Sequence, residues 1–409
     1  MQQRKSHKKS RKGCQNCKKR HVKCDEQGPP CAACIARNTE STCNYEKSQL
    51  PQDTRDGPGV SSKSDTRRLA ELELMHRWST STFKCLCILP EDVQYLQIAV
   101  PRAAFKHDYL LNGIMALAAL EIAIGDDAID QAKKRAYLDH ASRYYALASQ
   151  SLRVALCNIT KETHHSIYQC SMMLTVINMA IPLSKHVEDD EFDEKRLGML
   201  DRMVLLFNLF LGNGSIVLVN FEWLLNSPAE PSLRAGIALR QKMRPENLDA
   251  LTTAALARLS SVIDAALACG DSMAIDESLH PYQGAVKQLG ECFMLDSDDS
   301  IKGFCISFPM FAGPEFALSF RRMEPLALFI AMHWAVLLQR LPAEAWWAVG
   351  VGKQLVLEIS EMLLSETQLT TMVEWHQNIA WAREQVGLNP SDDTQKPQPA
   401  ARIQKNGSF

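Results

Sequence analysis

Six of the thirteen cysteines in this 409-residue chain fall within one stretch of thirty residues. They have the spacing C-x2-C-x6-C-x6-C-x2-C-x8-C and are Cys14, Cys17, Cys24, Cys31, Cys34 and Cys43. Two cysteines separated by two residues can bind one edge of a tetrahedral zinc site, with thiolate sulfurs about 2.3 Å from the metal. Six thiolates complete two four-coordinate sites only if two of the sulfurs bind both metals. The spacing therefore predicts a site for two Zn²⁺ ions per chain, without telling which cysteines are shared.

The alternative for six cysteines is a disulfide-linked domain. Disulfides are typical of oxidising compartments, and we expect no secretion signal here, because the N-terminus has a basic run from Arg4 to Lys12 in place of an apolar segment. We therefore favour zinc. The metal is also expected to supply the folding energy, since thirty residues with few large apolar side chains cannot bury enough surface alone.

Positive charge is concentrated at the N-terminus. Ten of the 45 Lys and Arg residues lie in residues 1–24, which contain no Asp or Glu, so the remaining chain has 35 basic and 47 acidic residues and a net charge of -12. This asymmetry predicts a polyanionic partner for the N-terminal end only. A solvated tail is the alternative for its first part. The tail residues expected to contact phosphate or to direct nuclear import are Arg4, Lys5, Lys8, Lys9, Arg11 and Lys12.

The cysteine pattern, with the basic residues between Cys17 and Cys24, resembles the fungal Zn2Cys6 binuclear cluster, a DNA-binding domain. The resemblance implies a short helix followed by an extended strand in each half of the module. It also implies that Cys14 and Cys31 are the two shared ligands. One zinc would then be bound by Cys14, Cys17, Cys24 and Cys31, and the other by Cys14, Cys31, Cys34 and Cys43.

The first half of the module carries almost all of its positive charge and is therefore expected to face DNA. The candidate contacts are Lys18, Lys19, Arg20, His21 and Lys23. Arg and Lys can donate hydrogen bonds to guanine O6 and N7 in the major groove. The resemblance implies that Arg20 and His21 approach the bases of a CGG-like or TCG-like half-site. Lys18 and Lys23 are expected to contact phosphates, with a solvated charge as the alternative for each lysine.

Beyond the cysteines the composition changes twice. Residues 47–68 are rich in Pro, Gly, Ser and charge and predict a flexible linker. Leu69, Leu72 and Met75 follow helical spacing for only two turns, so no coiled coil is expected. The predicted organisation is a disordered basic tail (1–13), the zinc module (14–46), the linker (47–68), an all-α multi-helix regulatory domain (69–388) and a disordered tail (389–409).

Apolar periodicity predicts the helices of the regulatory domain. They are expected at about 110–124, 128–159, 164–181, 196–211, 246–268, 281–294, 315–341, 344–365 and 368–386, with one short strand candidate at 215–219. No membrane span is expected. The best candidates, 109–125 and 325–338, contain fewer than the roughly 20 apolar residues that crossing a bilayer requires.

Several of these segments also resemble the regulatory domain of fungal sterol uptake control proteins. They are His107–Ala123, Arg322–Leu341, Trp346–Leu355 and Trp375–Gly387. The resemblance implies that the helical domain binds a small apolar ligand, a sterol, which controls nuclear entry. Five tryptophans could line a pocket for it or could equally be ordinary core residues: Trp334, Trp346, Trp347, Trp375 and Trp381. A homodimer, if one forms, is expected to use the helical domain.

The chain contains no Walker A loop, HExxH or GxSxG motif, so we do not expect an enzyme. The predicted function is a nuclear, sequence-specific, DNA-binding RNA polymerase II transcription factor of fungal type that acts on the transcription machinery. Its expected targets are the genes of a secondary-metabolite cluster. The alternatives are a sterol-responsive regulator of lipid or sterol genes and a non-specific nucleic-acid-binding interaction protein.

Overall fold

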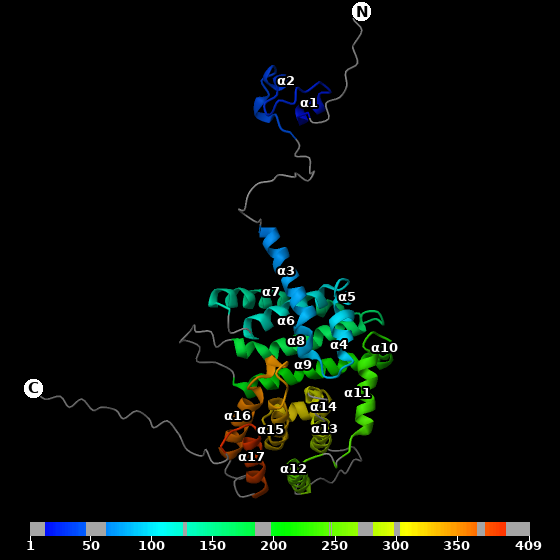
Figure 1. The fold of residues 1–409 in the computed structure, drawn as a ribbon, viewed down its shortest axis with the longest axis vertical. Coiled ribbons are helices and arrows are strands. Elements are labelled where there is room, and N and C mark those ends of the chain that lie inside the picture. The colour runs from blue at the N-terminus through cyan, green and yellow to red at the C-terminus, as the bar shows by residue number, and fades with distance from the viewer. Residues whose placement is uncertain are drawn as a thin grey trace, which may run out of the picture. The chain divides into compact units, whose positions relative to one another are not determined.

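The computed structural model describes residues 13–45, 63–125, 129–184, 198–244, 246, 248–268, 281–297, 303–365 and 373–389. The chain divides into two compact units, Met1–Ser62 and Lys63–Phe409 (Figure 1). The described residues form helices and no strand, which confirms the predicted all-α class. We call the first unit the cysteine module and the second the helical unit.

The cysteine module contains short helices, and the helical unit contains both short and long ones. The cysteine module contains α1 (Gln15–Lys19), α2 (Ala32–Ile35) and a 3-10 turn (Glu40–Thr42). The helical unit contains α3 (Lys63–Thr80), α4 (Asp92–Gln94), α5 (Val100–Ala104), α6 (Asp108–Gly125), α7 (Gln131–Leu156), α8 (His164–Ser184), α9 (Met199–Val219), α10 (Phe221–Leu225), α11 (Glu230–Lys242), α12 (Ala250–Ala268), α13 (Pro281–Asp296), α14 (Phe308–Arg321), α15 (Pro325–Gln339), α16 (Val351–Ser365) and α17 (Val373–Gln385).

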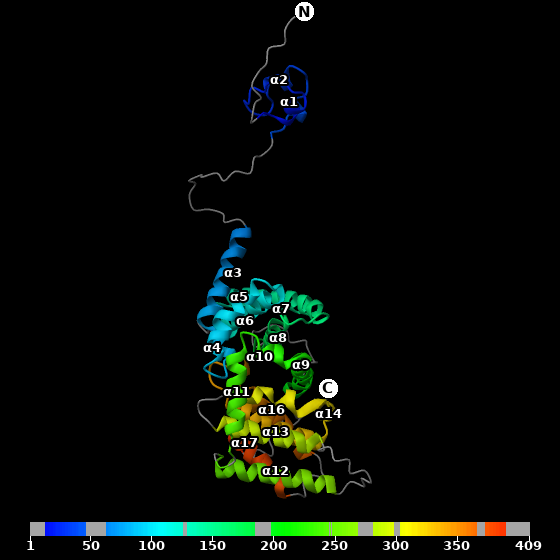
Figure 2. The ribbon, with the colours of Figure 1, turned by 90° about the vertical axis from the view of Figure 1, so that its right-hand side faces the viewer.

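The helical unit is built around apolar helices that other helices cover on all sides. α15 contains no charged residue, and every residue from Ala327 to Leu338 is buried. A helix that is apolar all round must be covered on every side, and α13, α14, α16 and α17 contact it. In both views α6–α9 gather on one side of the unit and α12–α17 on the other (Figures 1 and 2). α9 contacts α8 in the first group and α14 and α16 in the second, so it joins the two groups.

The predicted helix 344–365 begins only at Val351, and two other predicted elements differ in kind or number. Ser215–Val219, the strand candidate, forms the last turn of α9, where the Ser215 hydroxyl donates to the Leu211 carbonyl 3.0 Å away. A five-residue apolar run fits either element, and the preceding helix decides the outcome here. The predicted helix 315–341 is two helices. Pro325 restricts Glu324 to an extended conformation (ψ 131°), and Met323 has a positive φ of 55°, so α14 ends and α15 begins anew.

The linker prediction is also corrected at one end. α3 begins at Lys63, so the last six residues assigned to the linker are helical. An i,i+4 ion pair supports this start, with Arg67 Nε 2.8 Å from Glu71 Oε1. The remaining domain boundaries stay predictions.

Three described helices are long and apolar enough, by length and composition alone, to cross a membrane: α6, α9 and α12. That none of the helices spans a membrane stays a prediction. In the structure each of these helices supplies buried side chains to one continuous hydrophobic core, for example Leu117, Phe207 and Leu259.

His333 on α15 is a buried titratable group of this core. Its Nδ1 lies 2.7 Å from the carbonyl oxygen of Phe329, and its ring stacks on that of Trp381 with centroids 5.4 Å apart. The pKa of the imidazole is lowered to about 4, chiefly by burial. The hydrogen bond to Phe329 raises the pKa, and the charge of Arg258 lowers it. An unfolded histidine has a pKa near ~6.5. The unfolded chain therefore binds more protons between pH 6.5 and 4, and stability falls as the pH drops through that range.

We expect the wild-type protein to lose about 1–2 kcal/mol of unfolding free energy through His333 between pH 7.5 and pH 5.5. A His333→Gln variant should lack this part of the pH dependence. Urea unfolding followed by tryptophan fluorescence measures the helical unit selectively, because all seven tryptophans lie beyond residue 62. Equal pH dependence in both proteins would contradict the expectation.

Candidate metal centre and nucleic-acid interface

The six clustered cysteines of the sequence come together in the cysteine module as buried free thiols. The Sγ atom of Cys14 lies 3.7 Å from those of both Cys31 and Cys34, and Cys17 Sγ lies 3.6 Å from Cys31 Sγ. Two sulfurs bound to one tetrahedral zinc at about 2.3 Å lie roughly 3.8 Å apart, whereas disulfide sulfurs lie about 2.05 Å apart. The separations therefore fit ligands that share a metal and do not fit disulfides.

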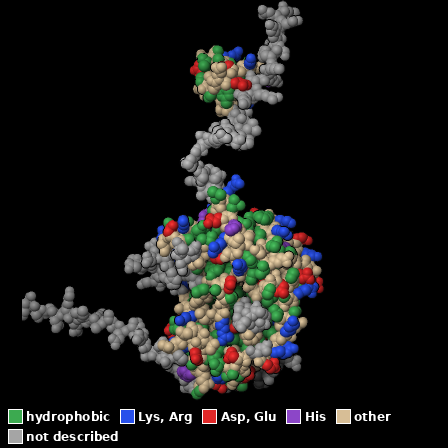
Figure 3. Space-filling model, viewed as in Figure 1, with side chains coloured by type: hydrophobic (Ala, Val, Ile, Leu, Met, Phe, Trp, Pro, Cys, Tyr) green, Lys and Arg blue, Asp and Glu red, His purple; other side chains and the backbone are tan. Residues whose placement is uncertain are grey.

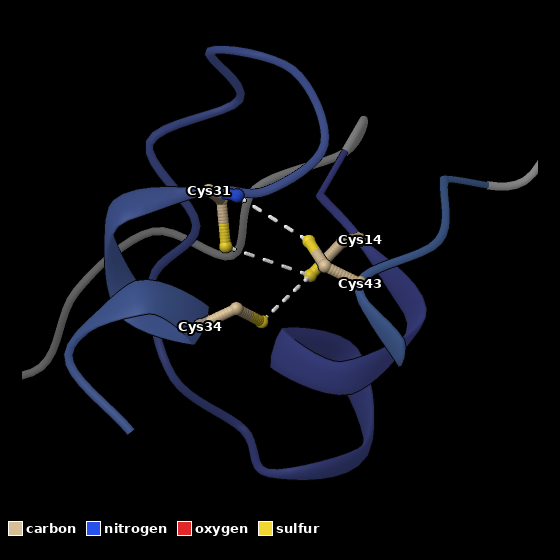
Figure 4. Close-up of side chains that lie close together, drawn as sticks. All are labelled: Cys14, Cys31, Cys34 and Cys43. Atoms are coloured by element: carbon tan, nitrogen blue, oxygen red, sulfur yellow. Dashed lines mark hydrogen bonds between the residues drawn. The ribbon is translucent and has the colours of Figure 1, made fainter. Parts of the chain in front are cut away.

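The thiols form two groups of four in which every sulfur lies within 4.8 Å of the others. The groups are Cys14, Cys17, Cys24 and Cys31, and Cys14, Cys31, Cys34 and Cys43. Figure 4 shows the second group, whose side chains point toward one another from the start of α1, from both ends of α2 and from the segment after the 3-10 turn. Cys14 and Cys31 belong to both groups. The donor set thus fits two zinc ions with these two cysteines shared, the arrangement that the resemblance implies.

The main chain builds both halves in the same way. Cys14 caps α1 and Cys31 caps α2, seventeen residues later. The amides of Lys18 and Ile35 donate to the carbonyls of Cys14 and Cys31, each at 3.0 Å. No strand follows either helix within residues 13–45, so the helix–strand pairing that the resemblance implies is absent from the described module.

Both module helices end in the same turn. The amide of Val22 donates to the Cys17 carbonyl, and the amide of Thr39 donates to the Cys34 carbonyl. The residues before these donors, His21 and Asn38, have positive φ angles of 53° and 52°. This is the helix-ending turn in which one left-handed residue lets later amides bond the last free carbonyls. The repeat makes Arg37 the counterpart of Arg20.

Hydrogen bonds that the sequence did not suggest hold the module closed around the thiols. The Tyr45 hydroxyl lies 3.4 Å from Cys24 Sγ, and Asp25 Oδ2 accepts from the Ala32 amide at 3.1 Å. Asn16 Nδ2 donates to the Thr42 carbonyl at 3.0 Å. These contacts join the two halves, and no spacing rule identifies them because each depends on the folded path of the chain.

The pKa shifts differ among the thiols. Burial raises the pKa of Cys14 and Cys17, because a buried thiolate loses its hydration. At Cys31 and Cys34 burial acts in the same direction, but hydrogen bonds to the thiolate outweigh it and lower the pKa. A bound divalent cation favours the thiolate at every position, since the thiolate is the ligand form and metal binding displaces the protons. A bound metal ion would thus compensate the negative charge of thiolates that are shielded from water.

All five candidate DNA contacts are exposed and lie at one end of α1. Lys18 and Lys19 form its last turn, Arg20 is its C-cap, and His21 and Lys23 follow. The equivalent positions of the second half are Ile35, Ala36, Arg37, Asn38 and Glu40. Basic side chains therefore gather on the first half only. The tail residues from Arg4 to Lys12 lie outside the described residues. On the face of the helical unit drawn in Figure 3, basic and acidic side chains are interspersed.

The five tryptophans of the predicted pocket pack against protein groups. The indole N–H groups of Trp334 and Trp347 donate to the carbonyls of Cys305 and Cys85, at 2.8 and 3.0 Å. The remaining ones also lie against the core. Trp375 stacks on Phe329 and Trp381 on His333, and Trp346 packs at the core edge.

These contacts favour the core alternative, and a ligand pocket at the five tryptophans stays a prediction. A groove that the described residues do form lies between α7, α8 and α9, and none of these tryptophans lines it.

Comparison with known proteins gives a family for the cysteine module. The model of the fungal Zn(2)-Cys(6) binuclear cluster domain matches residues 12–52. A Zn(2)-C6 fungal-type transcription factor of Gibberella zeae is 24% identical over an alignment that covers 93% of this chain and 87% of that protein. A second factor so named, from Aspergillus fumigatus, is 29% identical over 50% of this chain. The chain spans 55% of the length of that relative.

The alignment with a third relative is short. Sterol uptake control protein 2 of Candida albicans is 66% identical over 42 residues, which are 10% of this chain and 6% of that protein. No solved structure gave a significant match. The comparison thus finds a similarity to a sterol uptake control protein, but the 42 matched residues are too few to cover the helical unit.

These findings bear on two predictions. A cluster domain of this family binds two zinc ions, and the two thiol groups agree with that number, which confirms the predicted cofactor. The relatives with the longer alignments are named as transcription factors, which agrees with the prediction that the chain is not an enzyme. Residues 12–52 thus match the fungal Zn(2)-Cys(6) binuclear cluster domain, and the chain is similar to proteins named as fungal transcription factors of this type.

Proposed function

We propose that the six module cysteines hold the two zinc ions, with Cys14 and Cys31 bound to both. Each of these two thiols lies at the start of a module helix and belongs to both groups of four. When bound, the ions would supply the charge that stabilises buried thiolates. Cys17 and Cys24 would then bind one ion and Cys34 and Cys43 the other.

We propose that the protein is a sequence-specific DNA-binding transcription factor. The observation that carries this proposal is the group of five exposed basic residues at the end of α1, beside the metal centre. Arg20 and His21 contact base edges in the major groove, and Lys18, Lys19 and Lys23 contact phosphates. The tail basic residues add phosphate contacts or direct nuclear import.

We propose a nuclear location and RNA polymerase II promoters as the place of action, as the similarity to fungal transcription factors suggests. The helical unit acts as the regulatory domain that reaches the transcription machinery. Secondary-metabolite genes are the proposed targets. A sterol-responsive role has less support, because the match to sterol uptake control protein 2 covers 42 residues and the tryptophans of the expected pocket are packed in the core.

Selection of binding sites from random duplex DNA by the zinc-loaded full chain tests the proposed function. Enrichment of a motif that contains a CGG-like or TCG-like triplet, by a protein with two zinc ions per chain, is the expected result. Two zinc ions without any enriched motif would contradict it and would favour a non-specific nucleic-acid-binding protein.

Arg20→Ala is expected to weaken binding to the selected site by about 1–3 kcal/mol and to relax the preference at one base pair. Arg37→Ala is the matched control, since Arg37 occupies the same place in the second half, where no other basic residue lies nearby in sequence. It should change binding by less than ~1 kcal/mol. Fluorescence anisotropy on the selected site and on single-base variants measures both. An equal loss on every sequence would make Arg20 a phosphate contact.

A further inference from the structure

The thiols of the cysteine module differ in the kind of group that forms a hydrogen bond with them. Main-chain amides donate to Cys14 Sγ at 3.4 Å and to Cys43 Sγ at 3.3 Å. Cys24 Sγ lies 3.4 Å from a side-chain group, the hydroxyl of Tyr45. A main-chain amide is present whatever the side chain is, whereas the hydroxyl depends on the residue at position 45. The contact with Cys24 is therefore one that a single substitution can remove.

The folded path of the chain brings Tyr45 to Cys24, which precedes it by 21 residues. The carbonyl of Asn44 accepts a hydrogen bond from the Gln15 amide at 2.7 Å, so the end of the described module returns to the start of α1. From this place the partly buried ring of Tyr45 packs against the cysteine cluster. The ring and the hydroxyl thus have separate contacts, because the ring packs beside the thiols and the hydroxyl reaches one of them.

The direction of the Tyr45–Cys24 bond follows from the chemistry of a metal ligand. A thiolate carries no proton, so a sulfur in its ligand form can only accept, and the phenolic hydroxyl donates. Hydrogen bonds to an ionised acceptor are stronger than those between neutral groups. The carboxylate of Asp25 also lies near, with Oδ1 3.9 Å from Cys24 Sγ, and a neighbouring negative charge disfavours a thiolate. The hydroxyl of Tyr45 offsets this repulsion.

We propose that Tyr45 is a positioning residue of the metal centre, whose hydroxyl holds the Cys24 thiolate in place for one of the two zinc ions. Cys24 belongs to the first group of four thiols and not to the second. The hydroxyl therefore acts on the ion of the first group. This inference rests on the proposed two-zinc assignment and goes beyond it, because it makes the two sites unequal through a residue that is not itself a ligand.

The same hydroxyl influences DNA binding through the metal. Cys17 and Cys24 both belong to the first group, so a zinc ion bound by them closes the segment between them. That segment, residues 18–23, carries all five candidate DNA contacts. Cys24 fixes the far end of the segment, and Tyr45 acts on it through Cys24. Loss of the hydroxyl should therefore weaken DNA binding when zinc is scarce, and excess zinc should restore it.

Tyr45→Phe in the full chain tests the proposal, because it removes the hydroxyl and keeps the ring. Groups that hold a metal ligand by a hydrogen bond typically contribute about 10–100-fold to metal affinity. We expect the affinity for one zinc ion to fall about tenfold and the affinity for the other to stay that of the wild type. Competition with a zinc chelator measures both affinities. At saturating zinc the variant should still hold two ions per chain.

A spectroscopic readout and a control separate this role from general damage to the module. The two ions of the cadmium-loaded full chain are expected to give separate cadmium NMR resonances. Tyr45→Phe should shift one resonance and leave the other in place, whereas a loosened module would move both. Ser41→Ala is the matched control, because it removes an exposed hydroxyl from the same module. It should change neither zinc affinity nor the cadmium resonances.

The outcomes distinguish this inference from the assignment on which it rests. A wild-type chain with two zinc ions, and a Tyr45→Phe chain with both affinities unchanged or both equally reduced, would overturn the role of Tyr45 alone. A wild-type chain that holds fewer than two ions would overturn the two-zinc assignment and this inference with it. DNA binding of Tyr45→Phe that stays weak in excess zinc would make the hydroxyl a DNA contact and would also overturn the positioning role.

Discussion

A Cys31→Ser variant is expected to lose both zinc ions and all sequence-specific DNA binding, while its helical unit stays folded. Cys31 belongs to both groups of thiols, so its replacement removes a ligand from each metal. Among residues 13–45 the buried side chains are those of the six cysteines, and Ala33 and Tyr45 are the partly buried hydrophobic residues that pack against them. Zinc binding in comparable small domains supplies about 10–16 kcal/mol, and the described part of the module has no apolar core to replace it.

The expected gradation among the cysteines sharpens this prediction. Cys14→Ser should be as severe as Cys31→Ser, whereas Cys17→Ser or Cys43→Ser removes a ligand from one metal and should leave close to one zinc per chain. Cys157→Ser is the matched control. Cys157 is an exposed cysteine at the end of α7, in the helical unit, and its replacement should change neither zinc content nor DNA binding.

Three measurements on the same samples decide the outcome. Zinc is counted by its release to a chromogenic chelator, DNA binding is measured by anisotropy, and tryptophan fluorescence reports on the helical unit. The helical unit should stay folded because its core shares no residue with the cysteine cluster. A Cys31→Ser protein that retains two zinc ions would refute the shared-ligand assignment.

Gly352→Ala should destabilise the helical unit by about 3 kcal/mol, a large effect for one added methyl group. Gly352 lies in the first turn of α16, where it packs against α15. A Cβ at this place would come closer than 3.0 Å to the carbonyl oxygen of Ala335 and to the amide nitrogen of Gln339. Both belong to the main chain of a helix that is buried along its length, so neither can move aside as a flexible side chain would.

Gly290→Ala is the matched control for Gly352→Ala. Gly290 also lies in a helix, α13, but no heavy atom lies within 4 Å of an added Cβ there. This change should stabilise the unit by about 0.5–1 kcal/mol through helix propensity alone. Urea unfolding of both variants measures the two effects. A Gly352→Ala protein as stable as the wild type would mean that α15 and α16 pack less closely than described.

Much of the chemistry could be read from residues that are close together in sequence. The spacing of six cysteines predicted the two-zinc module, and the basic residues between Cys17 and Cys24 predicted its charged half. Apolar periodicity predicted the all-α class and most helices. Errors arose where two elements fit one short pattern. The run 215–219 fits a strand as well as a helix, and the single apolar stretch around Pro325 conceals a helix break.

The metal chemistry could be predicted from the sequence alone, because ligand type and spacing are local and thirty residues leave few ways to bring six thiols together. So could the helical class, because periodicity is local. Which cysteines lie in both groups became known only from the folded chain, as did the packing of the late tryptophans against core groups and the close approach of α15 to Gly352. Burial and contact depend on residues far apart in sequence, such as Trp347 and Cys85, and no local pattern encodes which of them meet.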